Sequence, residues 1–333
     1  MPVRAPRRFG ADDFETALAA SNAVGRPLSV RLALPFCRQA CRHCARPVAG
    51  DATGIPEAYL TRLDREMVLV RRPLDPARRV QALHWGGGTP SLLRLDQMSD
   101  LIDRLAARFS LESGPSRDFA IELDPREADV LTLRHLEALG FNRLRLTVLD
   151  LTPRVQAAVG RPCPRPLIEP LLDEADRLGF RSLAVELALG LPHQSGERLA
   201  DTLSQVAAMA PPRILLHRAS PPVAGAPDAD DLEARAERLL AEAGYAAWRP
   251  GHYARRGPAL DDARAQADRE ARRDRLGLGV GAHSRLPDAE ARNATTLADY
   301  AAALDAGRLA TASGQWRSRP VDPPPHRADG GIT

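Results

Sequence analysis

Residues 29–44 read SVRLALPFCRQACRHC. The residues before Pro35 are mostly aliphatic or β-branched, which is typical of a short buried strand. Cys37, Cys41 and Cys44 follow directly, spaced as C-x-x-x-C-x-x-C. Three thiolates in so short a loop can hold three irons of a four-iron, four-sulfur cluster and leave the fourth iron open to a ligand. This stretch therefore predicts a strand that leads into a cluster-binding loop.

A structural zinc ion is the alternative for these cysteines. Zinc in such sites takes four closed ligands. His43 lies too near its neighbours in the chain to complete a tetrahedron comfortably, and Cys163 is more than a hundred residues away. Three unligated buried cysteines are a further alternative. Arg38, Arg42 and Arg46 could lower the pKa of the thiols or could simply form a solvated face.

Short apolar runs alternate with longer amphipathic segments along the rest of the chain. Strands are expected at residues 29–34, 80–85, 119–123, 143–149, 182–187 and 213–217, with a further one at 276–280. Helices are expected at residues 56–71, 98–109, 126–139, 167–178, 197–209 and 231–243, where apolar side chains recur at the helical period. Gly140, Gly179 and Gly244 each follow such a segment, where a glycine commonly ends a helix.

This alternation predicts an α/β fold in which helical crossovers join parallel strands. The pattern leaves open a doubly wound open sheet and a whole or partial barrel. In barrels the reacting groups lie just after the carboxyl ends of the strands. Cys37, residues 86–90, Glu122 and residues 190–192 each end or follow a predicted strand, so we expect them to converge on one rim.

A second candidate site follows the second predicted strand, where residues 84–90 read HWGGGTP. Consecutive glycines let a backbone approach a ligand closely and expose its N–H or C=O groups. A glycine-rich turn can also serve packing alone, and this one lacks the G-x-x-x-x-G-K pattern of a phosphate-binding loop. Its place about forty residues after the cysteine loop makes the combination specific.

Composition restricts the compartment and the partners. Among 333 residues there are only four cysteines, so no disulfide framework is available and we expect a reducing cytosol. The sequence contains neither a recognisable export signal nor an apolar window long enough to cross a membrane. All 46 basic residues are arginine, and they are scattered among 43 acidic residues. This distribution argues against nucleic-acid binding.

Taken together, the motifs resemble the family of oxygen-independent coproporphyrinogen III oxidases and its paralogue, the radical SAM haem chaperone, within the radical SAM superfamily. The resemblance spans roughly residues 26–300. It rests on RPLS at 26–29, LPFC at 34–37, GGGTP at 86–90, IELDPRE at 121–127, GFNRL at 140–144, VQ at 155–156, GLP at 190–192 and LGLGV at 276–280. The run GHYAR at 251–255 resembles the oxidase rather than the chaperone.

The resemblance implies a partial (β/α)6 barrel of the radical SAM type with a reduced C-terminal extension. It divides the chain into an N-terminal extension at 1–27 and a barrel at 28–250 whose cluster loop lies at 37–44. A family-specific extension at 251–316 and a tail at 317–333, which we expect to be disordered, complete the chain.

Two cofactors follow from the resemblance, a four-iron, four-sulfur cluster on the cysteine triad and S-adenosylmethionine (SAM) chelated to its open iron. The residues implied to contact SAM or line its pocket are Gly87, Gly88, Thr89, Glu122, Arg161, Glu186 and Ala219. The implied reaction in haem biosynthesis is oxidative decarboxylation of coproporphyrinogen III to protoporphyrinogen IX. A 5′-deoxyadenosyl radical removes hydrogen from a propionate β-carbon, carbon dioxide leaves and a vinyl group remains. No side chain is assigned as catalytic.

The expected partners are a tetrapyrrole or haem and a protein that reduces the cluster. We expect a monomeric, cytoplasmic protein that neither binds nucleic acid nor spans a membrane. Plainer interpretations remain for single residues: Glu122 and Arg161 could form surface salt bridges, and Cys163, in a loop between two prolines, could be an idle thiol.

Several positions depart from the family pattern. Arg31 stands where the family has a tyrosine close to the SAM sulfonium, which would bring two positive charges together. His43 replaces an aromatic residue, Leu149 a glutamine and Glu186 an aspartate, and residues 265–274 stand where the family has Asn-Phe-Gln-Gly. The oxidase's N-terminal extension and C-terminal helical domain are shortened. These departures leave two alternatives, a haem-binding or haem-chaperone paralogue without porphyrinogen chemistry, and a radical SAM enzyme with an unrelated substrate.

Overall fold

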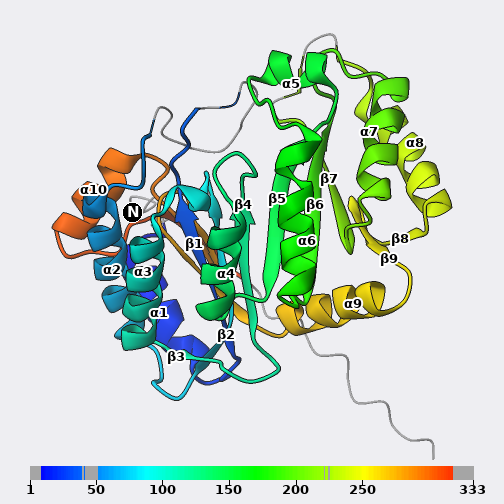
Figure 1. The fold of residues 1–333 in the computed structure, drawn as a ribbon. Helices are drawn as coiled ribbons and strands as arrows, with labels where there is room; N and C mark the ends of the chain where they lie inside the picture. The colour runs from blue at the N-terminus through cyan, green and yellow to red at the C-terminus, as the bar shows by residue number, and fades with distance from the viewer. Residues whose placement is uncertain (1–8, 40, 42–51, 221, 224–225, 318–333) are drawn as a thin grey trace, which may run out of the picture.

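The computed structural model describes residues 9–39, 41, 52–220, 222–223 and 226–317. A sheet of parallel strands forms the centre of this part of the chain (Figure 1). Its parallel strands are β1 (Leu28–Leu34), β2 (Arg79–Gly87), β4 (Asp118–Leu123), β5 (Arg143–Leu149), β6 (Ser182–Leu189) and β7 (Arg213–Arg218), each paired with the next. All of the strands predicted before residue 250 are therefore confirmed, with ends that differ by two residues at most.

Helices join these strands and lie along one face of the sheet (Figure 1). They are α2 (Glu57–Arg71), α3 (Leu95–Arg108), α4 (Val130–Ala138), α5 (Pro153–Val159), α6 (Glu169–Arg177), α7 (Gly196–Ala208) and α8 (Ala229–Glu242), with short 3-10 turns at Pro90–Leu92 and Arg165–Leu167. The helix predicted to begin at residue 126 begins only at Val130. There the Asp129 carboxylate accepts the Thr132 N–H at 2.8 Å and caps the helix.

The sheet extends at both edges beyond the parallel strands. Within the described residues it has 13 strands, ordered β13-β12-β11-β10-β1-β2-β4-β5-β6-β7-β9-β8, with β3 (Ser110–Leu111) paired to β2. The added strands are β8 (Tyr245–Arg249), β9 (His252–Arg255), β10 (Asp274–Leu278), β11 (His283–Arg285), β12 (Ala289–Asn293) and β13 (Thr311–Trp316). Since β13 and β8 are the two ends of this order, the barrel is partial, as predicted.

Regular structure continues after residue 250, in the segment that the resemblance marks as a family-specific extension. Helices α9 (Pro258–Ala271) and α10 (Leu297–Asp305) lie among the added strands, and α1 (Ala11–Ser21) precedes β1. The further strand predicted at 276–280 is β10, which lies two residues earlier and pairs in parallel with β1. None of the described helices is both long and apolar enough to span a membrane.

The two faces of the parallel strands differ in polarity. On one face Val30, Leu32 and Trp85 are almost completely buried in the main apolar core. On the other face polar side chains stand opposite one another, since Arg31 is the register partner of His84. The inside of the partial barrel therefore carries charge rather than a dry apolar filling.

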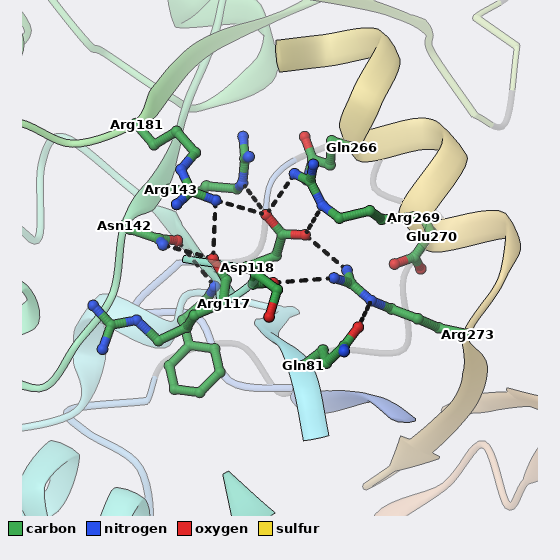
Figure 2. A network of polar contacts seen from close by, with 12 residues as sticks. Gln81, Arg117, Asp118, Asn142, Arg143, Arg181, Gln266, Arg269, Glu270 and Arg273 are labelled. Carbon is green, nitrogen blue, oxygen red and sulfur yellow. Dashed lines mark hydrogen bonds and ion pairs between the residues drawn. The ribbon is translucent and has the colours of Figure 1, made fainter. Parts of the chain in front are cut away.

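Helix α9 crosses the amino-terminal end of the parallel strands, away from α5 (Figure 1). Figure 2 shows Arg269 of α9 and Arg273, just after the helix, meeting Asp118. This carboxylate accepts hydrogen bonds from Arg143 at 2.9 Å, Arg269 at 2.9 Å and Arg273 at 2.8 Å. Burial would raise the pKa of Asp118, but the hydrogen bond from Arg269 and the charge of Arg143 lower it to about 2. Asp262 of α9 binds Arg143 as well, at 2.7 Å. We call this cluster the ionic floor; it closes one end of the barrel.

Candidate functional site

The chain turns sharply as it leaves β1, because the Phe36 N–H donates to the Leu34 carbonyl at 2.9 Å. Cys37 follows this turn at the carboxyl-terminal end of the strand. Cys44 and His43 lie outside the described residues, so the third predicted ligand stays a prediction. Within the described residues no three His, Cys, Asp or Glu side chains are grouped to hold a metal ion. That finding does not test the triad, because one of its members lies outside.

The glycine turn at residues 86–88 is held against this loop by its backbone. The Gly88 N–H donates to the Leu34 carbonyl at 2.9 Å, and the Thr89 N–H donates to the Phe36 carbonyl at 2.8 Å. A Cβ at Gly88 would lie only 2.5 Å from the Phe36 carbonyl oxygen. Glycine at this position is therefore required by close packing of β2 on the cysteine loop, whatever ligand the turn contacts.

Two polar side chains approach the described cysteines. The Thr89 hydroxyl donates to Cys37 Sγ at 3.4 Å, and an Arg161 guanidinium N–H donates to Cys41 Sγ at 3.6 Å. A hydrogen bond to sulfur, and above all a nearby cation, favours the thiolate over the thiol. Both contacts therefore suit cysteines that act as metal ligands.

A cavity of about 960 Å³, partly open to solvent, lies at the carboxyl-terminal ends of the parallel strands. We call it the rim cavity. It brings together every described residue that the sequence assigned to cluster or cofactor: Cys37, Cys41, Gly87, Gly88, Thr89, Glu122, Arg161, Glu186 and Ala219. Apolar side chains from Val159, Ala188 and Leu191 complete part of the wall. The expectation that these positions converge on one rim is confirmed.

Glu122 and Glu186, two of the three carboxylates that line the rim cavity, are buried and tied to neighbouring strands. Glu122 is bound by His84 at 3.1 Å and by Arg145 at 3.1 Å. Glu186 accepts the Thr147 hydroxyl at 2.9 Å, and Arg145 lies 3.7 Å from it. Burial lowers the pKa of His84, although its hydrogen bond with Glu122 opposes the shift. Glu122 is thus not the surface salt bridge that we considered, since only 6% of it is exposed.

Arg161 reaches the cavity from the loop after α5 and is held there from two sides. It pairs with the Asp124 carboxylate at 2.8 Å and donates to the Thr147 carbonyl at 2.8 Å. Burial would raise the pKa of Asp124, but the hydrogen bond from Arg126 and the charge of Arg161 lower it. Asp124 belongs to the quoted IELDPRE run, yet we assigned it no role; its pairing across the cavity wall is visible only in three dimensions.

Comparison with known proteins agrees with this geometry. The profile of the Radical SAM superfamily matches residues 33–206. An oxygen-independent coproporphyrinogen III oxidase of Pseudomonas aeruginosa is 36% identical over 324 residues, which cover 90% of this chain and 70% of the relative. One of Escherichia coli is 34% identical over 89% of this chain and 69% of the relative.

The solved structure of coproporphyrinogen III oxidase (HemN) from Escherichia coli, described as a radical SAM enzyme, superposes with a TM-score of 0.83 at 31% identity. The superposed part covers 93% of this chain and 76% of the chain in the solved structure. The chain belongs to the oxygen-independent coproporphyrinogen III oxidase family, within the radical SAM superfamily. Membership implies a four-iron, four-sulfur cluster and SAM.

Two positions that depart from the family pattern lie in different places. Arg31 does not line the rim cavity; its guanidinium turns toward α9 and pairs with Glu270 at 2.7 Å. Leu149 does line the rim cavity, and its φ of 74° is rare for a branched residue. The guanidinium of Arg31 is therefore directed away from the rim cavity. Leu149, by contrast, changes the wall of the cavity itself, because an apolar side chain stands where the family pattern has a glutamine.

Cys163 is separate from the rim cavity. It is fully buried in the main apolar core, and burial raises the pKa of its thiol to about 11. Its backbone is fixed by Gln156, whose side chain accepts the Cys163 N–H at 3.1 Å and donates to its carbonyl at 2.8 Å. A neutral, buried thiol agrees with the idle role considered from the sequence.

Proposed function

We propose that this chain is a radical SAM enzyme that carries a four-iron, four-sulfur cluster on Cys37, Cys41 and Cys44. It holds SAM in the rim cavity and acts on a tetrapyrrole that bears propionate side chains. One observation supports this most strongly: the rim cavity joins the described cysteines to the glycine turn and to two buried carboxylates. The names of the relatives supply the reaction, the oxidation of coproporphyrinogen III.

The residues present fit both groups. Cys37 and Cys41 each receive a hydrogen bond at sulfur, from Thr89 and Arg161. Thiolates that hold iron need such electropositive surroundings.

When bound, the cluster and SAM supply a one-electron cleavage that creates a radical able to remove hydrogen from carbon. The chain's own residues bind and orient SAM. Arg161, fixed by Asp124, and Glu122 bind the polar parts of SAM, while Gly87 and Gly88 let the backbone approach it. Thr89, Glu186 and Ala219 line the pocket.

Anaerobic reconstitution tests the cluster. Iron and sulfide should be measured in wild-type protein, in Cys41→Ser and in Cys163→Ala as the matched control. Loss of iron and sulfide in Cys41→Ser, with normal content in Cys163→Ala, is the expected result. Incubation with dithionite and SAM should then yield 5′-deoxyadenosine from the wild type. A reconstituted wild type that forms none would end the claim to enzymatic activity.

A haem-binding or haem-chaperone protein without porphyrinogen chemistry is the second candidate. The contacts of Arg145 favour it, because this residue binds Glu122 and lies 3.7 Å from Glu186, so one protein cation already faces both carboxylates. Titration with haem, followed by absorbance, distinguishes the candidates. Stoichiometric haem binding without a vinyl product supports the second candidate, and absence of binding rejects it.

The proposal includes a separate protein that reduces the cluster, a monomeric state and a cytoplasmic location. The scarcity of cysteine supports the location. Light scattering during size-exclusion chromatography tests the monomer, and turnover with candidate flavodoxin-type or ferredoxin-type reductants in place of dithionite tests the partner.

A further inference from the structure

A second cavity lies inside the barrel, between the rim cavity and the ionic floor. We call it the lower chamber; it encloses about 810 Å³, and its polar lining includes Arg31, His84, Arg145, Arg249, His252 and Glu270. Arg145 precedes Thr147 of the rim cavity by two residues on β5. Through its 3.1 Å contact with Glu122, Arg145 stands in the wall between the two cavities. The proposed function assigns no role to this space.

Arginines outnumber carboxylates around the lower chamber. Arg31 and Arg275 share a single carboxylate oxygen of Glu270, at 2.7 Å and 3.3 Å. Arg143 and Arg213 likewise share one oxygen of Asp262, at 2.7 Å and 2.6 Å. The protein therefore supplies less negative charge than its own guanidinium groups could bind.

Arg249 has no carboxylate partner among the residues that the structure describes. Its guanidinium contacts the Trp248 ring, 4.5 Å from the guanidinium carbon, and His252 Nδ1, 3.3 Å from a guanidinium nitrogen. Arg249 is exposed, and it also lines an outer groove that shares Glu270 with the chamber. A ligand can therefore reach Arg249 from solvent without passing the rim cavity.

Several buried donors near the lower chamber lack an acceptor. Arg31 Nε, Trp248 Nε1 and Arg275 Nε are buried without a protein hydrogen-bond partner. Arg31 and Trp248 line the chamber itself, and Arg275 lines the outer groove. Buried donors in folded proteins are rarely left unpaired. Their gathering beside a surplus of cations suits a ligand rich in oxygen acceptors.

The titration of neighbouring groups agrees with this surplus. Burial and then the charges of Arg249 and Arg145 lower the pKa of His252 to about 3. A site that repels a further proton in this way attracts an anion.

We propose that the lower chamber binds a small anion with at least two negative charges, a phosphate or a polycarboxylate, and that Arg249 is its main charge partner. The planar guanidinium offers two parallel N–H donors to such oxyanions, a geometry that a lysine could not reproduce. The site is distinct from the rim cavity, and its occupancy does not depend on cluster or SAM.

Calorimetric titration of the whole chain with inorganic phosphate, and separately with citrate, tests the proposal at constant ionic strength. Arg249→Ala should weaken binding of the better probe by about tenfold or more, because a charge-assisted hydrogen bond is lost. Arg264→Ala is the matched control, since Arg264 is an exposed arginine of α9 that does not line the chamber. The affinity of Arg264→Ala for the same probe should equal that of the wild type.

Glu270→Gln should strengthen anion binding, whereas Arg249→Ala should weaken it. The substitution frees Arg31 and Arg275 from their shared carboxylate and should tighten anion binding several-fold. This gain cannot arise from misfolding, so the proposal stays testable if Arg249→Ala proves unstable in thermal unfolding. Phosphate binding alone identifies a phosphate site, and citrate binding alone a polycarboxylate site. The proposal would be overturned if neither phosphate nor citrate bound. It would also be overturned if Arg249→Ala and Arg264→Ala lost the same affinity for the anion, or if Glu270→Gln gained none.

Discussion

Replacing Gly88 with alanine is expected to force the cysteine loop away from β2. The new Cβ would lie 2.5 Å from the Phe36 carbonyl oxygen, 2.7 Å from the Phe36 nitrogen and 2.8 Å from the Leu34 carbonyl oxygen. All three are backbone atoms, so no side chain can rotate to relieve the contact. Since real Cβ contacts essentially never fall below 3.0 Å, the closest one must lengthen from 2.5 Å, a shift of about 0.5 Å next to Cys37.

Overpacking of this kind costs about 1–3 kcal/mol. The shift also weakens the two backbone hydrogen bonds from Gly88 and Thr89, each contributing about 1 kcal/mol. We therefore expect the free energy of unfolding of Gly88→Ala to fall by about 2–4 kcal/mol in urea. Iron bound per chain after anaerobic reconstitution should fall as well.

Gly54→Ala is the matched control for this prediction, because its added Cβ would have no neighbour closer than 3.9 Å. It should unfold at nearly the wild-type urea concentration and bind the wild-type amount of iron. If Gly88→Ala behaves as Gly54→Ala does in both measurements, close packing is not the reason for this glycine.

Three further predictions concern other parts of the molecule. Burial raises the pKa of Glu66 to about 7 against the hydrogen bonds from Tyr300 and Gly279, so the folded chain holds a proton that the unfolded chain releases. Wild-type stability should therefore fall, relative to Glu66→Gln, by about 1–3 kcal/mol as the pH rises from about 4.5 to about 7, as measured by urea unfolding across that range. Asp118→Asn should lower the free energy of unfolding by about 3–5 kcal/mol at neutral pH, because it leaves buried arginines without their counterion. Since the pKa of Asp118 is lowered to about 2, the wild type should keep its higher free energy of unfolding until the pH falls from about 4 to about 2. Leu149→Gln, which restores the family residue, should tighten SAM binding to reconstituted protein about 2- to 10-fold in equilibrium dialysis, while Leu131→Gln on the exposed surface of α4 should change nothing.

The parallel part of the fold was predictable because its signals are local. Each strand is a short apolar run, and each is followed by a segment with helical period. Placing Cys37 and Glu122 on one rim required only the rule that parallel strands end at the same edge. The ends of helices were less certain, since a single capping carboxylate, Asp129, moved one start by four residues.

The elements after residue 250 were not predictable in the same way. Strands β11 and β13 expose most of their residues and carry no run of buried apolar side chains. Helix α9 reads as a polar surface helix, although Asp262, Arg269 and Glu270 pair with residues of the parallel strands. Asp262 and Asp118 meet their arginines across distances in sequence that no motif spans, so the ionic floor and the partner of Arg31 appear only in the folded chain.

The ionic floor bears on where this protein can be divided. Asp262 pairs with arginines from β5 and β7, and Glu270 pairs with Arg31 from β1, so α9 fastens strands from opposite sides of the open barrel. A fragment ending at residue 250 would keep every residue proposed to contact the cofactors. It would nevertheless lose these counterions and also β10, the strand that pairs in parallel with β1. The segment recognisable as the superfamily, residues 33–206, is therefore smaller than the unit that these contacts hold together.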